Sequence, residues 1–139
     1  MNYRLYDSGK RLFRRLIAGE KTPKYGLYVT YANKAMDDVP EATKEFFETI
    51  ASGTYTGYAR VPVTAVNAVA DGVAFIGMLS SDDLIGGKLT KNTVITSATL
   101  VSLGETTETD EFLYTALFKQ PVKVTEGAYI TVNLKINLG

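Results

Sequence analysis

The stretch Ile130-Thr131-Val132-Asn133-Leu134-Lys135-Ile136-Asn137-Leu138, close to the end of the chain, decides the fold class. Its apolar and polar residues alternate one by one, which matches the two-residue repeat of a β-strand and not the repeat of a helix. Such a strand buries one face and exposes the other. The sequence therefore predicts a half-buried C-terminal strand, and we expect the turn at Glu126-Gly127 to pair it with residues 122–124.

Extended segments also precede this strand. Alternation or β-branched runs predict strands at residues 25–31, 55–63, 73–79, 93–103 and 112–118. Proline cannot donate a hydrogen bond to a ladder, so Pro62 indicates an edge or a bulge and Pro121 is expected to end the strand before it. Residues 112–118 are apolar on both alternating faces, which favours a central strand or one covered by a neighbouring subunit.

Residues 33–53 interrupt this pattern. Phe46, Phe47 and Ile50 follow Pro40 at helical spacing, and Gly53 ends the segment, so we expect one short helix here. Several short strands without regularly alternating helices predict a mainly β fold. The expected architecture is an antiparallel, jelly-roll-like β-sandwich with a short basic N-terminal helix and one short inserted helix.

The composition excludes several kinds of chemistry. The chain has 139 residues, enough for one domain, and contains no His, Cys or Trp. Serine or cysteine nucleophiles activated by histidine, zinc clusters and disulfides are therefore absent. Carboxylates remain the candidates for a catalytic pair, and we expect them in solvated loops, where nothing would raise the pKa of a general acid. These are Asp82, Asp83, Glu105, Glu108, Asp110 and Glu111. We predict no enzyme, no cofactor and no metal site.

The formal net charge of zero hides an uneven distribution. Residues 1–24 hold seven basic and two acidic side chains, a balance of 7 − 2 = +5, and the other residues hold 8 − 13 = −5. We therefore divide the chain into a basic arm, residues 1–24, and a single β-sandwich domain, residues 25–139. The arm is expected to fold back on its own body, to be exchanged between copies or to dock on another acidic surface. A solvated basic face is the alternative.

Within the arm, an amphipathic helix is predicted. Leu12, Phe13, Leu16 and Ile17 fall on one side, and the basic side chains fall on the other. Those basic residues are Lys10, Arg11, Arg14 and Arg15. A helix of about ten residues is marginal in water, so its apolar side needs a surface to pack against. We take all eight residues as candidates for partner binding.

Two other kinds of partner are not favoured. The chain has no stretch of about 18 apolar residues and no signal-peptide pattern, so we expect no membrane partner. An acidic body repels phosphates, so we also expect no nucleic acid partner.

Tyr58 and Arg60 lie two residues apart in a predicted strand and therefore share one face of the sheet. A guanidinium there pairs with a carboxylate or stacks on a ring. Either the two side chains contact a partner, or they connect this face of the sheet to a neighbouring loop.

The segment Tyr55-Thr56-Gly57-Tyr58-Ala59-Arg60-Val61-Pro62-Val63 resembles one that recurs in small virion proteins of tailed bacteriophages. The order of the flanking patterns agrees over residues 25–139: a strand like residues 25–29 comes first, and an apolar strand, the turn at residues 121–127 and an alternating last strand follow. The helical insertion and the absence of Trp set this chain apart from those proteins.

This resemblance implies a structural role in the virion. Proteins of this kind are head decoration, head-fibre or tail-fibre components, so the expected partners are other virion proteins, such as capsid, collar or tail subunits, and further copies of the chain in a homo-oligomer. A capsid decoration or fibre-anchoring subunit is the preferred function. The alternative is a tail or collar adaptor, or a glycan-binding module of a tail fibre that uses exposed tyrosines as a platform.

Overall fold

The computed structural model of the chain is mainly β, and the strand pairs in its described part are all antiparallel. The structure describes residues 3–32, 55–80, 83–85, 93–124, 127 and 129–137. The helix that the sequence predicts within residues 33–53 lies outside these ranges, as do Asp82 and Glu126. The described part contains one α-helix, and it lies in the basic arm as predicted.

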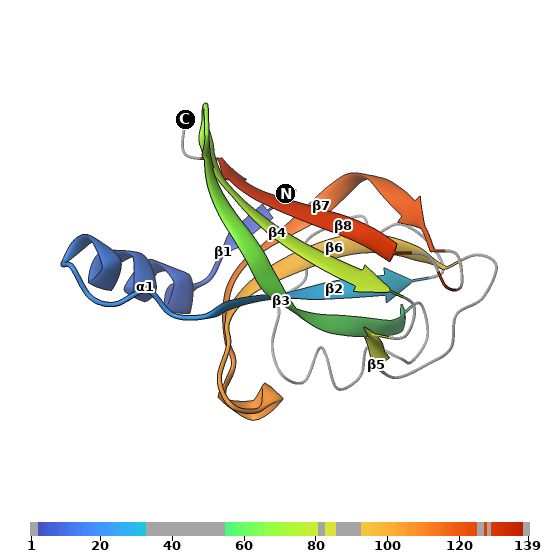
Figure 1. Cartoon of the computed structure of the whole chain (residues 1–139), viewed down its shortest axis with the longest axis horizontal. Helices are drawn as coiled ribbons and strands as arrows, with labels where there is room; N and C mark the ends of the chain where they lie inside the picture. Colours follow the sequence, from blue (N-terminus) through green and yellow to red (C-terminus); the bar gives the residue numbers. More distant parts are fainter. Residues whose placement is uncertain are drawn as a thin grey trace.

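The strands follow a single path through space (Figure 1). Their order in the sheet is β1-β7-β6-β2-β3-β4-β8, and β5 pairs with β3 beside this path. In chain order the elements are β1 (Tyr3–Leu5), α1 (Asp7–Ile17), β2 (Tyr25–Ala32), β3 (Tyr55–Val69), β4 (Gly72–Ser80), β5 (Leu84–Ile85), β6 (Val94–Ser102), the 3-10 turn η2 (Thr107–Thr109), β7 (Glu111–Lys123) and β8 (Tyr129–Asn137). The result is an open, curled antiparallel sheet, which confirms the mainly β class.

Strand β3 belongs to both halves of the curl. Its first half pairs with β2 as far as Pro62, and its second half pairs with β4 from Val63 onwards. The register with β4 shifts between Val63 and Ala65. Because such an irregularity bends a strand and increases its twist, it allows one long strand to serve both halves. The irregularity follows directly after the proline that the sequence marked as a bulge or edge position.

The core lies on one face of this sheet. Along β2, the side chains of Leu27, Val29 and Tyr31 are fully buried and alternate with residues of the other face. Strand β8 shows the alternation that the sequence predicts, since Val132 and Leu134 are buried in the same cluster while the residues between them are exposed. Each fully buried large apolar side chain contributes about 1.5–3 kcal/mol to the free energy of unfolding.

The prediction that β8 pairs with residues 122–124 is wrong. Strand β8 pairs with β4 along its whole length, from Tyr129 opposite Ser80 to Asn137 opposite Gly72. Val122 instead lies opposite Ile95 of β6. The last residues of β7 instead extend its ladder with β6 as far as Lys123.

Pro121 does not end the strand at residue 118 as predicted, because β7 runs on from Glu111 to Lys123. The register with β6 jumps from Leu117 opposite Ser97 to Val122 opposite Ile95. Pro121 therefore lies in a segment that is skipped by the ladder, where its missing N–H costs no hydrogen bond. Of the two alternatives expected for this strand, the structure shows the first, since β7 lies between β6 and the short β1, which the sequence reading missed.

Candidate functional site

Helix α1 is the first candidate site, and it has two unlike faces. Leu12 is only 3% exposed and belongs to the main core, and Phe13 and Leu16 pack partly buried against that core. Ile17, the fourth apolar residue of the predicted stripe, is 88% exposed. The stripe therefore packs against the chain's own body, which is one of the three arrangements expected for the arm. Leu12 is not accessible to a partner in this arrangement.

A close contact with β7 holds the helix in place. The ladder between β6 and β7 skips Leu113, whose carbonyl accepts a hydrogen bond from the backbone N–H of Tyr6 at 3.0 Å. Gly9 lies against this carbonyl, so that a Cβ atom at position 9 would collide with the oxygen. Only glycine permits this approach. The first turn of α1 is thereby fixed against the sheet.

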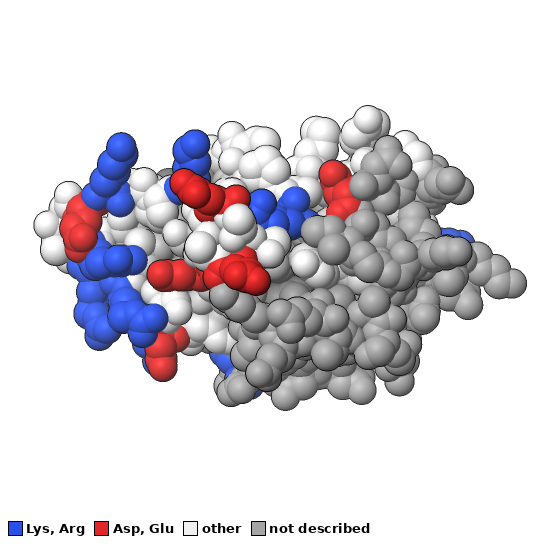
Figure 2. Space-filling view, turned by 90° about the horizontal axis from the view of Figure 1, so that it is seen from below, with Lys and Arg blue, Asp and Glu red and all other residues white. Residues whose placement is uncertain are grey.

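The basic face of α1 is exposed. Lys10, Arg11, Arg14 and Arg15 are all exposed. Figure 2 shows a group of basic side chains at one end of the molecule. Lys10 lies 4.0 Å from Asp7, and Arg11 donates a hydrogen bond to the Ser8 hydroxyl at 3.2 Å. Both contacts are within the helix and exposed, so they contribute little to stability.

Arg14 and Arg15 form no ion pair with any residue in the described ranges. Together with Arg11 and Glu111 they line a small hollow of about 260 Å³. Positive charge in the last turn is favourable in the field of the helix dipole, so these side chains do not need a partner for the helix to form. The arrangement presents unpaired guanidinium groups on a fixed support, which suits carboxylate or phosphate groups of a partner.

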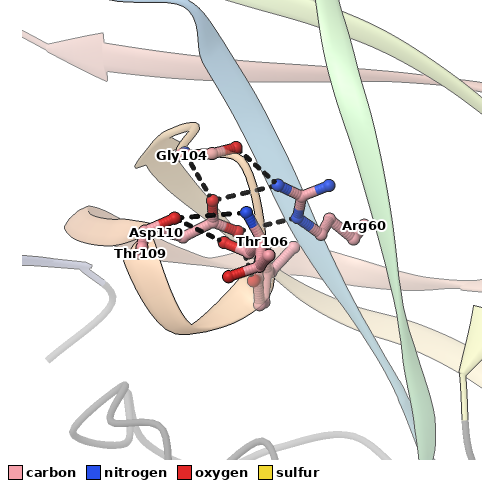
Figure 3. Close-up of polar contacts among 6 residues, drawn as sticks. Arg60, Gly104, Thr106, Thr109 and Asp110 are labelled. Carbon is pink, nitrogen blue, oxygen red and sulfur yellow. Dashed lines mark hydrogen bonds and ion pairs between the residues drawn. The ribbon is translucent and has the colours of Figure 1, made fainter.

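The second candidate site surrounds Arg60, whose side chain extends from β3 across β2 to the loop between β6 and β7 (Figure 3). Its Nε donates to Asp110 Oδ2 at 2.7 Å, and its terminal nitrogen donates to Asp110 Oδ1 at 3.0 Å. The same nitrogen also donates to the Gly104 carbonyl at 3.3 Å. Of the two readings of Arg60, the structure shows the connection to a neighbouring loop.

Asp110 is the centre of this network. Besides Arg60, its carboxylate accepts hydrogen bonds from the Gly104 N–H at 2.7 Å and from the Tyr28 hydroxyl at 2.5 Å. The side chain has no exposed surface, whereas Arg60 keeps about a quarter of its side chain exposed. The sequence reading placed Asp110 among exposed acids and was wrong here, because four hydrogen bonds compensate for its burial.

These contacts hold the ion pair in its charged form. Burial raises the pKa of Asp110, but the hydrogen bonds from Arg60, Tyr28 and Gly104 together lower the pKa by more, so the net shift is downward. The hydrogen bond to Asp110 raises the pKa of Arg60, and burial raises the pKa of Tyr28. A carboxylate with a lowered pKa is a poor general acid, so Asp110 acts as a structural anion.

Tyr58 lies on the same face as Arg60, as predicted from their spacing. Its ring stacks on that of Tyr28, with centroids 5.3 Å apart and an angle of 11° between the planes. Tyr28 also meets Phe112 edge to face at 5.4 Å. The sequence reading missed Tyr28 and its link to Asp110. A usable signal was present, since Tyr28 is a large aromatic residue on the strand face opposite to Leu27 and Val29.

The other acidic candidates that the structure describes differ from Asp110 because they are exposed. Asp83 accepts a hydrogen bond from the Ser80 N–H at 2.7 Å, and the side chains of Glu105, Glu108 and Glu111 are exposed. Among the residues that the structure describes, no three Asp or Glu side chains come together in a way that could hold a metal ion.

Comparison of the chain with protein-family models, with curated proteins and with solved structures found no match. Within the described ranges, no helix has the length and apolar character needed to cross a membrane.

Proposed function

We propose that this chain is a non-enzymatic structural protein of a tailed-bacteriophage virion, a capsid decoration or fibre-anchoring subunit that attaches through its N-terminal arm. The observation that carries the proposal is the cationic face of α1, fixed on the body by Leu12 while Arg14 and Arg15 remain unpaired among the described residues. Its docking target is an acidic surface of another virion protein. Many weak contacts of this kind give firm attachment when the copies are arrayed on a particle.

Assembly with further copies is part of this proposal. Strand β8 lies at one end of the strand order, so no described strand pairs with its outer edge. An unpaired strand edge offers a row of backbone donors and acceptors to another chain. In the assembled particle, we expect neighbouring copies to pack against the curled sheet.

Charge reversal on the arm tests this function without removing the packed side of the helix. Recombinant protein with Arg11→Glu, Arg14→Glu and Arg15→Glu is added to particles that lack the chain, and incorporation is measured by co-sedimentation. We expect the incorporation of this variant to fall at least tenfold relative to wild type. The binding of wild type to the particles is expected to weaken as the salt concentration rises.

Single variants provide the matched comparison. Arg14→Glu and Lys123→Glu change the net charge equally, and both side chains are exposed, but Lys123 lies on β7 away from the arm. Only Arg14→Glu is expected to reduce incorporation. Equal incorporation of the triple variant and wild type would rule out α1 as the anchor, and light scattering on the free protein tests the expected homo-oligomer separately.

One observation bears on the alternative of a glycan-binding tail-fibre module. Tyr3 and Tyr129 are 59% and 76% exposed, whereas the other tyrosines with described side chains are buried or partly buried. Tyr3 is stacked on Tyr114, which leaves Tyr129 as the more open ring. Glycan-array binding that disappears in Tyr129→Ala but persists in Tyr3→Ala would favour this alternative over a scaffold role.

A further inference from the structure

An apolar groove of about 790 Å³ lies between the C-terminal half of α1 and the strands β3 and β4. Phe13, Leu16 and Ile17 line it from the helix, and Val63, Val66 and Phe75 line it from the two strands. Figure 1 shows α1 at one end of the molecule, close to the start of β2 and beside the rising β3–β4 hairpin. The volume is in the range of pockets that enclose small ligands.

The walls of this groove offer few hydrogen bonds. Of the described side chains in the lining, only Thr22, Lys24, Tyr25 and Thr64 carry a polar atom. The Thr64 hydroxyl already donates to the Ile76 carbonyl at 3.2 Å. An extended peptide placed here would leave most of its backbone N–H and C=O groups without partners, which is costly. An alkyl chain has no such groups and gains from burial along its whole length.

The charge at the rim of the groove indicates which polar group a ligand with an alkyl chain would carry. Among the residues that the structure describes, Lys24 is the one charged residue in the lining and no acidic residue contributes to it, and Lys21 is exposed three positions earlier in the arm. In a two-fold symmetric contact, a second copy of the chain would bring the same cations against this rim. A ligand with a single negative group next to a long apolar part matches both the rim and the walls.

We propose that this groove binds one free, single-chain anionic amphiphile, with its alkyl chain along Phe13, Val63 and Phe75 and its carboxylate at Lys24. This site is separate from the cationic face of α1 that the proposed virion role uses. Its failure would leave that role intact, because the two sites are tested by different variants.

Titration calorimetry with a homologous series of carboxylates tests the proposal. Octanoate, decanoate and dodecanoate are titrated into the full chain below their micelle concentrations. Burial of a methylene group contributes about 0.8 kcal/mol, so affinity is expected to rise about fourfold for each added methylene. Dodecyltrimethylammonium, which has the same chain and the opposite charge, is expected to bind more weakly. Absence of binding, or affinity independent of chain length, would overturn the proposal.

Matched variants locate the site. Ile17 and Met78 are both exposed apolar residues, at 88% and 56%, but only Ile17 lines the groove. Ile17→Glu is expected to weaken dodecanoate binding at least tenfold, and Met78→Glu to leave it unchanged. Val66→Glu repeats the test from the opposite wall. For Lys24→Gln we expect a loss of up to about fivefold, since exposed ion pairs contribute at most about 1 kcal/mol. Equal effects of Ile17→Glu and Met78→Glu would contradict the assignment.

Two further measurements separate other occupants. If sedimentation velocity shows self-association that Ile17→Glu abolishes and dodecanoate does not displace, the groove is an interface between copies and the proposal fails. If the protein binds phosphatidylglycerol vesicles but not dodecanoate, a bilayer is the partner, and the proposal of a free amphiphile also fails.

Discussion

Arg60 and Arg14 are the same type of residue in opposite situations. Arg60 reaches a carboxylate with no exposed surface and makes two short hydrogen bonds to it, so its charge is used within the chain. Arg14 is exposed on α1 and forms no ion pair with a described residue. The comparison teaches that a cation is available to a partner only where the fold does not already supply its anion.

Arg60 and Arg14 differ because one lies on a strand of the sheet and the other lies on helix α1. Arg60 lies opposite Tyr28 in the ladder of β2 and β3, and the loop after β6 brings Asp110 over both strands. Helix α1 uses its apolar side for packing, so the period of the helix directs its arginines outward. Four predictions test this contrast between an internally paired charge and a freely presented one.

The largest effect is expected for Asp110→Ala. This change leaves the guanidinium of Arg60 and the hydroxyl of Tyr28 without their shared anion, and breaking a buried pair in this way costs about 3–5 kcal/mol. Urea unfolding measures the loss of unfolding free energy. Glu105→Ala, an exposed acid in the same loop, is the control and should change stability by less than about 0.5 kcal/mol. Similar losses for the two variants would show that the network does not stabilise the fold.

A somewhat smaller effect is expected for Leu12→Ala, which empties a core position on the packed side of α1. Replacements of this kind cost about 2–5 kcal/mol, depending on how far the site collapses. Ile17→Ala is the matched control on the same helix, and its exposed side chain should cost less than about 0.5 kcal/mol. Equal unfolding midpoints in urea for Leu12→Ala and wild type would mean that the arm does not pack on the body in solution.

Low pH should remove part of the contribution of Asp110 to the free energy of unfolding. Its pKa is lower in the folded chain than the value of about 3.9 expected when unfolded. The stabilisation is therefore complete above that value and is lost as the pH falls through the folded pKa. The difference in unfolding free energy between wild type and Asp110→Asn should shrink as urea titrations move below about pH 4. A constant difference would contradict the assignment of a charged Asp110.

The smallest effect on stability is expected on the basic face. Replacing Arg11, Arg14 and Arg15 by Gln should change the unfolding free energy by less than about 0.5 kcal/mol per residue, because their contacts are exposed. Particle incorporation should nevertheless fall. If thermal and urea unfolding show a large loss of stability in this variant, the three side chains serve the fold and not a partner.

The sequence alone allowed much of the fold to be predicted. The alternation of Val132, Leu134 and Ile136 with exposed residues identified β8, and the helical stripe at Leu12 and Leu16 identified α1. Both are local patterns, in which the spacing of side chains repeats with the backbone. The partner of β8 and the continuation of β7 through Pro121 were not predictable, because pairing depends on which distant edges meet.

The same division holds for the candidate sites. Local spacing by itself determined that Tyr58 and Arg60 share a face and that Arg14 and Arg15 lie opposite the apolar stripe. Only the tertiary structure decided that Asp110 is buried and pairs with Arg60, which lies 50 residues earlier in the sequence. It also decided that α1 forms one wall of an apolar groove. The physical reason is the separation in sequence over which each effect acts. A backbone repeat relates neighbours in sequence, whereas desolvation and charge pairing depend on the three-dimensional surroundings that the whole chain creates.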